Sequence, residues 1–348
     1  MIEFDQVVKT FPDGTTAVDH LDLTLPDGKI TVMVGPSGCG KTTSLRMINR
    51  MIDPTGGTIR IDGDDITSKD PAELRRGIGY VIQQAGLFPH RTIVDNIATV
   101  PFLLGTDRKQ ARAKALELME RVGLSTSFAK RYPVQLSGGQ QQRVGVARAL
   151  AADPPVMLMD EPFSAVDPVV RDQLQAEFLR LQQDLGKTIA FVTHDIDEAI
   201  KIGDLVAVFA EGGRLAQIAP PETLLAEPAD DFVAGFVGHD RGFRGLSFTQ
   251  ASALPVEPVD RAVDGATLSR DDAGRPLGWT RGDGETLIDH DGTFGPDNSV
   301  RAALDVAIRS PLGVAVRVDE HGRADGVVRH ETIATFLRER HQAGGGSA

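Results

Sequence analysis

The sequence lacks three features, and each absence narrows what the protein can be. With a single cysteine, Cys39, it cannot form an intramolecular disulfide, which suits a reducing compartment. The formal net charge of −12 disfavours nucleic acid as a partner, because surfaces that bind nucleic acid are rich in basic residues. No apolar run approaches the ~20 residues that span a bilayer, and the first residues show no signal-peptide pattern. We therefore expect any role at a membrane to depend on a partner.

What is present is the composition of a folded α/β protein. A length of 348 residues with 41% hydrophobic residues predicts about two domains with ordinary packed cores. In the first half, short apolar runs alternate with helical patterns, as in β-α units on a parallel sheet. Three apolar runs indicate buried strands that each end on polar residues, which places a ligand site beyond the carboxyl edge of the sheet. These runs are Ile30–Val34, Val156–Met159 and Thr188–Val192.

A glycine-rich segment follows the first of these strands. Residues 35–42 fit the P-loop pattern G-x-x-x-x-G-K-[ST], and a helix is expected over residues 42–49. Glycines let the backbone turn its N–H groups toward phosphates at a helix N-terminus. We expect Lys41 to neutralise the β- and γ-phosphates and the Thr42 hydroxyl to ligate Mg²⁺, and assign no redox role to the cysteine. The predicted ATP-binding residues of this loop are Gly35, Pro36, Ser37, Gly38, Cys39, Gly40, Lys41, Thr42 and Thr43.

Two adjacent carboxylates, Asp160 and Glu161, end the second apolar run. Such a pair is costly at the end of a buried strand without a cation or a chemical task. Asp160 is the predicted Mg²⁺ ligand, directly or through water. Glu161 is the predicted general base that polarises the water attacking the γ-phosphorus. The alternative is an acidic pair that caps a helix.

A second anion-binding helix start lies about a hundred residues after the P-loop. In the string Leu-Ser-Gly-Gly-Gln at residues 136–140, Ser137 is positioned to cap the helical run 140–152, and the two glycines expose backbone N–H groups. A capped helix without further role is the alternative. Because one nucleotide needs only one P-loop, a second phosphate-binding segment indicates that two copies of the chain share nucleotides.

These motifs, in this order, resemble the ATP-binding subunits of ABC transporters over residues 1 to about 238. The resemblance implies an α/β P-loop ABC ATPase domain, with a mixed sheet core and a helical subdomain at about 86–155. It also implies a homodimer that binds ATP and Mg²⁺, in which a signature motif closes over the ATP held by the facing subunit. The signature residues would be Leu136, Ser137, Gly138, Gly139 and Gln140.

Further positions match the same family. Gln83 matches the glutamine that senses Mg²⁺ and the attacking water, and His194 matches the switch histidine that contacts the γ-phosphate. Ser164 and Asp167 match the D-loop, which here carries Val166 where leucine is commoner. Phe11 falls where an aromatic ring stacks on adenine. Without the resemblance, a core phenylalanine and a structural histidine are the ordinary interpretations.

Several longer strings narrow the resemblance to the glycine betaine and choline importers. In such systems two ATPase subunits lie under two permease subunits on the cytoplasmic face of the membrane, and an extracytoplasmic binding protein delivers the solute. The segment after Gln83, through about residue 100, would receive the permease's coupling helices. An importer of another small solute such as an amino acid, a soluble non-transport ABC ATPase and a binding-only regulator are the alternatives. The matching strings are residues 47–54, 75–84, 86–90 and 194–199.

Composition changes near residue 238, where residues 239–253 indicate a linker. Residues 254–340 resemble the paired CBS modules that such subunits carry, a small α+β domain whose second copy is clearest at about 296–340. That copy is expected to contain a helix over 300–308, strands over 313–318 and near 326–328, and a final helix ending near Arg338. Residues 341–348 are rich in glycine and predict a disordered tail. Arg329 and Thr332 replace the Thr and Asp of nucleotide-binding CBS modules, so adenosine binding is not implied, and sensing of ionic strength or packing between subunits stays open.

Overall fold

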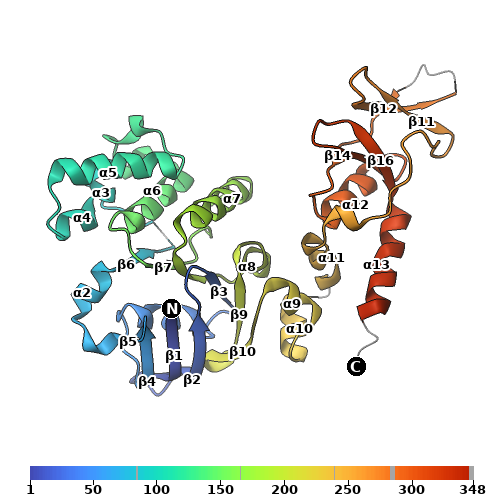
Figure 1. Ribbon diagram of the computed structural model, residues 1–348. Helices are drawn as coiled ribbons and strands as arrows, with labels where there is room; N and C mark the ends of the chain where they lie inside the picture. Colours follow the sequence, from blue (N-terminus) through green and yellow to red (C-terminus); the bar gives the residue numbers. More distant parts are fainter. Residues whose placement is uncertain (84, 165, 239, 283–286, 345–348) are drawn as a thin grey trace. The chain divides into compact units, whose positions relative to one another are not determined.

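The computed structural model describes residues 1–83, 85–164, 166–238, 240–282 and 287–344 (Figure 1). The chain divides into two compact units, Met1–Val237 and Gly238–Ala348. None of the described helices is both long and apolar enough to cross a membrane.

The first unit is built on a six-stranded sheet in the order β10-β9-β3-β8-β7-β6. Five strands are parallel, and β10 at the edge is antiparallel to β9. The three strands predicted from apolar runs are confirmed as β3, β7 and β8, and every residue of these three strands is buried. The strands are β3 (Ile30–Val34), β6 (Ile78–Val81), β7 (Val156–Asp160), β8 (Thr188–Val192), β9 (Leu205–Ala210) and β10 (Arg214–Ala219).

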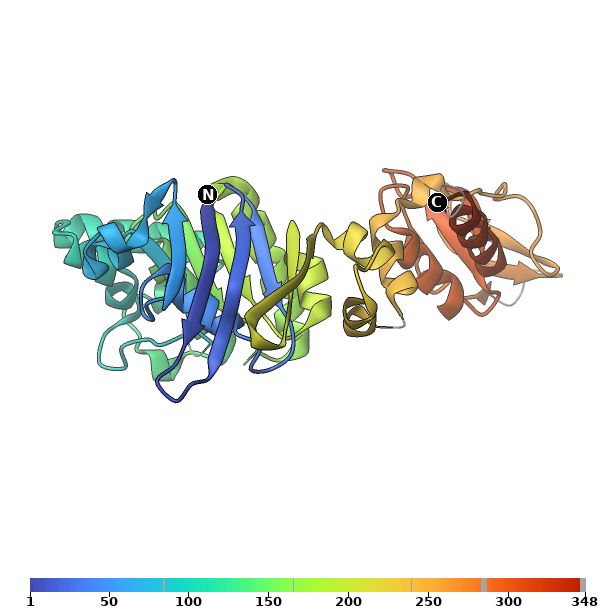
Figure 2. The same ribbon diagram turned by 90° about the horizontal axis from the view of Figure 1, so that it is seen from below.

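A second, antiparallel sheet in the order β2-β1-β4-β5 covers one face of this unit, and Figure 2 shows its strands in blue. In β2 the buried Leu21, Leu23 and Leu25 alternate with exposed polar residues, which directs one face into the core. That face shares a single apolar cluster with helix α1 and with strands of the parallel sheet. The elements are β1 (Ile2–Thr10), β2 (Thr16–Leu25), β4 (Gly56–Ile61), β5 (Asp64–Asp65) and α1 (Lys41–Ile48).

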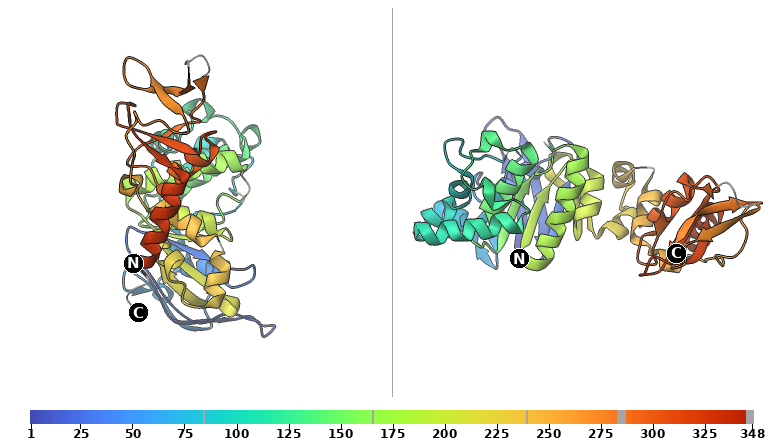
Figure 3. Two further views of the ribbon diagram at one scale, coloured as in Figure 1. Left: turned by 90° about the vertical axis from the view of Figure 1, so that its right-hand side faces the viewer. Right: turned by 90° about the horizontal axis from the view of Figure 1, so that it is seen from above.

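A helical subdomain interrupts the sheet between β6 and β7 (Figures 1 and 3). Its longest helix, α5, begins after Asp107, whose carboxylate accepts the backbone N–H groups of Lys109 and Gln110. The helices are α3 (Ile93–Ile97), α4 (Thr99–Leu103), α5 (Arg108–Arg121) and α6 (Gly138–Leu150). The remaining helices of the unit are α2 (Pro71–Arg76), α7 (Pro168–Leu185), α8 (Ile196–Ile202), α9 (Pro221–Ala226) and α10 (Asp231–Val237).

The second unit, orange and red in Figures 1 and 3, contains two small three-stranded sheets. In the β14-β15-β16 sheet, Ala315 and Val328 pack against helices α12 and α13, while Val316 and Val327 pack against the β11-β12-β13 sheet. This alternation follows from the period of two along a strand. The elements are β11 (Ala266–Arg270), β12 (Pro276–Arg281), β13 (Leu287–Ile288), β14 (Thr293–Phe294), α12 (Val300–Arg309), β15 (Val314–Val318), β16 (Ala324–Arg329) and α13 (His330–Gly344).

Two sequence-based boundaries differ in the structure. The expected linker 239–253 is wrong for its described part, because residues 241–253 form short helices whose Leu246 and Ala251 are buried in the core of the second unit. The sequence did not indicate this burial, because the few apolar residues are scattered through a polar stretch. The expected tail 341–348 also starts too early, since α13 continues to Gly344, and residues 345–348 lie outside the described residues. The short helices are α11 (Arg241–Gly245), Leu246–Phe248 and Ala251–Ala253.

Candidate nucleotide site

The P-loop connects β3 to α1 at the carboxyl edge of the parallel sheet. Its last glycine, Gly40, has φ of 93°, and a Cβ there would lie 2.2 Å from the carbonyl oxygen of Ala17. Any other residue would therefore be strained and would clash with the backbone of β2. The tight turn ends directly on the first residue of α1, which points the helix N-terminus into the loop, as anion binding requires.

The ammonium of Lys41 lies inside the curve of the loop. Only 6% of the residue is exposed, and Nζ donates to the carbonyl oxygens of Gly35 at 2.7 Å and Pro36 at 2.8 Å. A buried ammonium needs such acceptors, because an unpaired charge out of water is costly. A phosphate that enters the loop offers the same group a stronger, anionic acceptor. The other loop residue of note, Cys39, is buried.

Thr42 and Asp160 meet at the start of α1. The Thr42 hydroxyl donates to Asp160 Oδ1 at 3.0 Å, and Arg46 Nη2 lies 3.5 Å from Asp160 Oδ2. Burial and the neighbouring Asp160 carboxylate raise the pKa of Tyr80 above its ordinary value. A hydroxyl and a carboxylate at the mouth of a phosphate loop are the oxygen ligands that suit Mg²⁺. Within the described ranges, no group of three or more His, Cys, Asp and Glu side chains is placed to hold a metal ion.

Three predicted catalytic side chains form one cluster. Glu161 Oε1 lies 3.1 Å from His194 Nδ1, and Gln83 Nε2 donates to Glu161 Oε2 at 3.3 Å. The three residues follow β7, β8 and β6, which are neighbours in the sheet, so residues far apart in sequence meet at one edge. Glu161 has φ of 46° and its backbone N–H donates to the Val192 carbonyl oxygen at 2.9 Å, which fixes the direction of its side chain.

The D-loop is joined to the same cluster through the backbone. Both the N–H and the hydroxyl of Ser164 donate to the carbonyl oxygen of Glu161, at 3.3 and 2.9 Å. Asp167 directly precedes helix α7. Ala165 lies outside the described residues.

The signature motif begins helix α6 in the helical subdomain. The Ser137 hydroxyl accepts the N–H of Gln140 at 3.3 Å, and the Gln140 side chain accepts the N–H of Ser137 at 3.0 Å, which completes a capping box. Leu136 is buried. Gly139 faces α7, where a Cβ would lie 3.2 Å from Val170 Cγ1, so the glycine permits close helix packing. The signature and the P-loop thus come from different parts of the unit.

Phe11 lies in the turn between β1 and β2. Its backbone N–H donates to the Thr15 carbonyl oxygen at 2.9 Å, and the ammonium of Lys9 lies 5.4 Å from its ring centroid. The ring is half-buried. An accessible ring beside a cation is compatible with stacking against a base.

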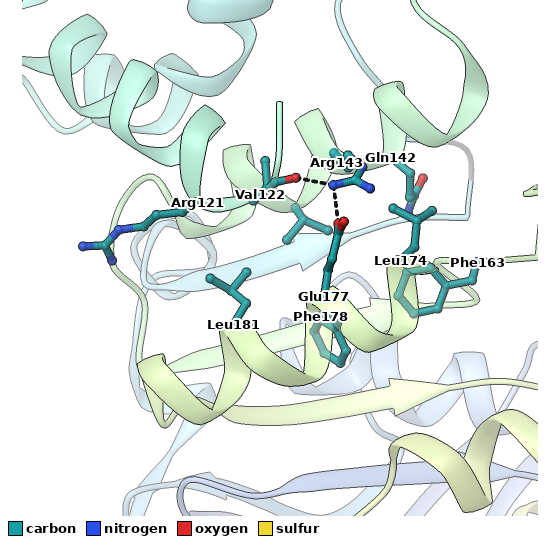
Figure 4. A pocket seen from close by; sticks show the side chains of 10 residues that line it. Arg121, Val122, Gln142, Arg143, Phe163, Leu174, Glu177, Phe178 and Leu181 are labelled. Carbon is teal, nitrogen blue, oxygen red and sulfur yellow. Dashed lines mark hydrogen bonds and ion pairs between the residues drawn. The ribbon is translucent and has the colours of Figure 1, made fainter. Parts of the chain in front are cut away.

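The sequence does not predict the contact surface between the helical subdomain and α7. A cleft of about 570 Å³ lies at this surface, beside the smaller apolar pocket that Figure 4 shows. Arg143 of α6 donates to the Val122 carbonyl oxygen at 2.7 Å and forms an ion pair with Glu177 of α7. One guanidinium therefore joins the end of α5, α6 and α7. The sequence gives little signal for it, because the three segments are separated by many residues.

The comparisons with known proteins agree with this geometry. A family model described as ABC transporter matches residues 18–164. The osmoprotectant import ATP-binding protein OsmV of Salmonella typhimurium is 43% identical, over 97% of this chain and 96% of its own length. The choline transport ATP-binding protein OpuBA of Bacillus subtilis is 50% identical, over 76% of this chain and 68% of its own length.

A solved structure gives the same result for the first unit. The dimeric, post-hydrolysis ATP-binding cassette MJ0796, bound to ADP and Pi, is 33% identical and superposes with a TM-score of 0.58, over 64% of this chain and 99% of that one. The match to OsmV extends along nearly the whole chain, so the second unit is shared with it as well. This chain therefore belongs to the ABC transporter family, as an ATP-binding subunit of the osmoprotectant importer group.

Proposed function

We propose that this ATPase subunit powers the import of a quaternary amine such as glycine betaine or choline through a partner permease. The support for this cargo is the family of the chain, since relatives similar over most of it are named for osmoprotectant and choline transport. In this proposal the solute site lies in the permease and the binding protein, so the residues of this chain do not distinguish one cargo from another. An importer of an amino acid or another small solute is therefore the alternative for the cargo.

ATP is proposed to bind at the P-loop, with its phosphates against the N–H groups of residues 35–43 and its adenine against Phe11. The geometry of Lys41 supports this, because its ammonium is already inside the loop and only exchanges carbonyl acceptors for phosphate oxygens. The positive end of the α1 dipole adds to the attraction.

Mg²⁺ is proposed to be held by Thr42, Asp160 and Gln83. When bound, the cation neutralises charge that develops on the phosphate oxygens. The contact of 3.0 Å between Thr42 and Asp160 supports this, because it holds two oxygen ligands together before the nucleotide arrives. Before the cation binds, the guanidinium of Arg46, 3.5 Å from Asp160, offsets the negative charge of that carboxylate.

Hydrolysis is proposed to use Glu161 as the general base. Its carboxylate takes the proton of the attacking water, while His194 contacts the γ-phosphate and Gln83 holds the water in place. The single observation that carries this is the cluster of these three side chains, with Glu161 held from both sides at 3.1 and 3.3 Å.

Two copies of the chain are proposed to share two nucleotides, each P-loop facing the partner's signature residues 136–140. The capped start of α6 supports this, because a helix N-terminus presents backbone N–H groups of the kind that bind phosphate. The dimer would lie on the cytoplasmic face of the membrane against the permease, near residues 83–100, with an extracytoplasmic binding protein delivering solute. Closure on ATP and reopening after hydrolysis would drive the permease.

The second unit is proposed to be a CBS-like regulatory domain at residues 254–340. The order β14, α12, β15, β16, α13 supports one complete copy at about 296–340, whereas the first copy contributes mainly the β11-β12 hairpin. Arg329, at the position where nucleotide-binding modules carry threonine, forms ion pairs with Glu257 at 3.4 Å and Asp264 at 3.6 Å. A side chain tied in this way supports a role in sensing ionic strength or in packing rather than in adenosine binding.

The test is uptake of labelled glycine betaine by vesicles that contain the subunit with its permease and binding protein, at low and high ionic strength. Glu161→Gln is expected to lower ATPase turnover and uptake by about a hundredfold or more, because it removes the general base while keeping ATP affinity. Glu222→Gln, the same change at an exposed site on α9, is expected to behave as wild type. ATPase activity without betaine uptake would overturn the cargo, and full ATPase activity in Glu161→Gln would overturn the base.

A further inference from the structure

Arg171, on the first turns of α7, bridges the two loops that flank the catalytic cluster. Its Nη2 donates to the carbonyl oxygen of Val166 in the D-loop at 3.2 Å. Its Nη1 lies 3.9 Å from Oδ2 of Asp195, the residue that follows His194. The guanidinium is a planar fork whose donors have fixed relative directions, so one side chain can hydrogen-bond the D-loop backbone and present its charge to the Asp195 carboxylate at the same time.

Asp195 connects this contact to the histidine. Its Oδ1 accepts the N–H groups of Asp197 at 2.9 Å and Glu198 at 3.3 Å, which caps α8, and its own N–H donates to Thr193 Oγ1 at 3.0 Å. The residue is therefore fixed by three bonds of its own. Because it is adjacent to His194, a displacement of Asp195 moves the ring that contacts Glu161.

The contacts form a closed circuit. Glu161 contacts His194 through its side chain, and its carbonyl oxygen accepts two bonds from Ser164 at the start of the D-loop. Arg171 closes the circuit on the far side, between the D-loop and Asp195. The general base is thus held between two segments that Arg171 ties together.

Arg171 is not needed to hold the helices themselves. One turn further along, Gln175 Nε2 donates to Glu198 Oε1 at 3.0 Å, and both residues are more than nine-tenths buried. This bond joins α7 to α8 independently. Removal of the guanidinium therefore frees the D-loop relative to His194 without separating the helices.

We propose that Arg171 is a positioning residue for hydrolysis, which couples the D-loop to the catalytic histidine through Asp195. The inference rests on the proposed roles of Glu161 and His194. It assigns to Arg171 no contact with the nucleotide. Its effect is on how well the base and the histidine are aligned at the moment of reaction, where displacements of about 1 Å cost up to a hundredfold in rate.

The experiment measures ATPase kcat and KM of the full chain with its permease, together with the number of ATP molecules bound per subunit. Arg171→Gln is expected to lower kcat by about tenfold to a hundredfold, with KM and the binding stoichiometry changed less than about twofold. An unchanged number of ATP molecules bound per subunit shows that the loss of kcat does not come from partly unfolded protein. Arg171→Lys, which retains the charge but not the fork, is expected to recover part of the rate. Arg180→Gln, an exposed arginine on the same helix, is the matched control and is expected to match wild type.

A double-mutant cycle with Asp195→Asn tests the coupling itself. Asparagine still caps α8, so this change removes the charge that faces Arg171 and little else. If the pair acts as one unit, the double variant loses no more activity than Arg171→Gln alone. If the losses of the two single variants multiply in the double variant, the proposal is overturned. An unchanged kcat in Arg171→Gln would overturn it as well. If Glu161→Gln hydrolysed ATP as fast as the wild type, the proposed function itself would be overturned instead.

Discussion

The polar contacts of the two units differ in how far apart along the chain the two partners lie. At the nucleotide edge of the first unit, Thr42 bonds Asp160 and Gln83 bonds Glu161, so each contact joins segments far apart in the chain. In the second unit many ion pairs are local and exposed, as between Asp319 and Arg323. That unit contains no lysine, and most of the ion pairs among its described residues are made by arginine. The candidate catalytic groups are thus held by contacts between distant segments, whereas exposed local pairs contribute little to stability because water and salt screen them.

Lys41→Ala acts at the nucleotide edge of the first unit and is expected to have the largest effect. It removes the one ammonium inside the P-loop curve, so ATP affinity should fall by about tenfold or more. Equilibrium binding of a fluorescent ATP analogue measures it. Lys201→Ala is the matched control, because Lys201 pairs with Asp172 at an exposed site on α8. Equal affinities in the two variants would contradict the P-loop assignment.

Much of this site could be predicted because local patterns specify it. The P-loop, the carboxylates at 160 and 161 and the capped start of α6 each lie within a few residues, and the apolar runs before them place them at strand ends. Contacts such as Arg143 with Glu177 were not predictable, because they depend on how the helical subdomain packs on α7. The antiparallel sheet was not predicted, although Leu21, Leu23 and Leu25 alternate with polar residues as in a strand with one buried face.

Arg143→Met is the next prediction and tests the boundary of the helical subdomain. The change leaves the Val122 carbonyl oxygen and the Glu177 carboxylate without their shared donor, and should lower the free energy of unfolding by about 1–3 kcal/mol. Arg121→Met, at an exposed position on the same cleft, should change it by less than about 0.5 kcal/mol.

The single tryptophan offers an internal control for this measurement. Trp279 is fully buried in the second unit, so its fluorescence follows that unit, whereas circular dichroism follows both. Arg143→Met should shift the circular dichroism transition and leave the Trp279 transition in place. A shift of both transitions would show that the contact does not act on the first unit alone.

Glu198→Gln should have a smaller effect, which depends on pH. Burial, together with the neighbouring Asp195, raises the pKa of Glu198 above its ordinary value, against the bonds from Thr193 and Gln175 and the nearby Arg171. A raised pKa means that the folded state favours the neutral acid, so this contribution to stability is lost as pH rises through the raised value. The variant is always neutral, and its unfolding midpoint relative to wild type should increase from acidic to neutral pH. Glu211→Gln, at an exposed position, should show no such trend.

The smallest effect is expected in the turns of the second unit, where Arg323 pairs with Asp319 and Arg275 with Asp271 in the same arrangement. In each turn the carboxylate also accepts two backbone N–H groups, which lowers its pKa, so the guanidinium is only one of several donors. Arg323→Gln should therefore leave the Trp279 unfolding transition unchanged, because the backbone bonds remain. Asp319→Ala removes all of these bonds and should lower the transition midpoint measurably. If Arg323→Gln lowered it as much as Asp319→Ala, the exposed charge pair rather than the backbone would hold the turn, and the contrast between the two units would fail.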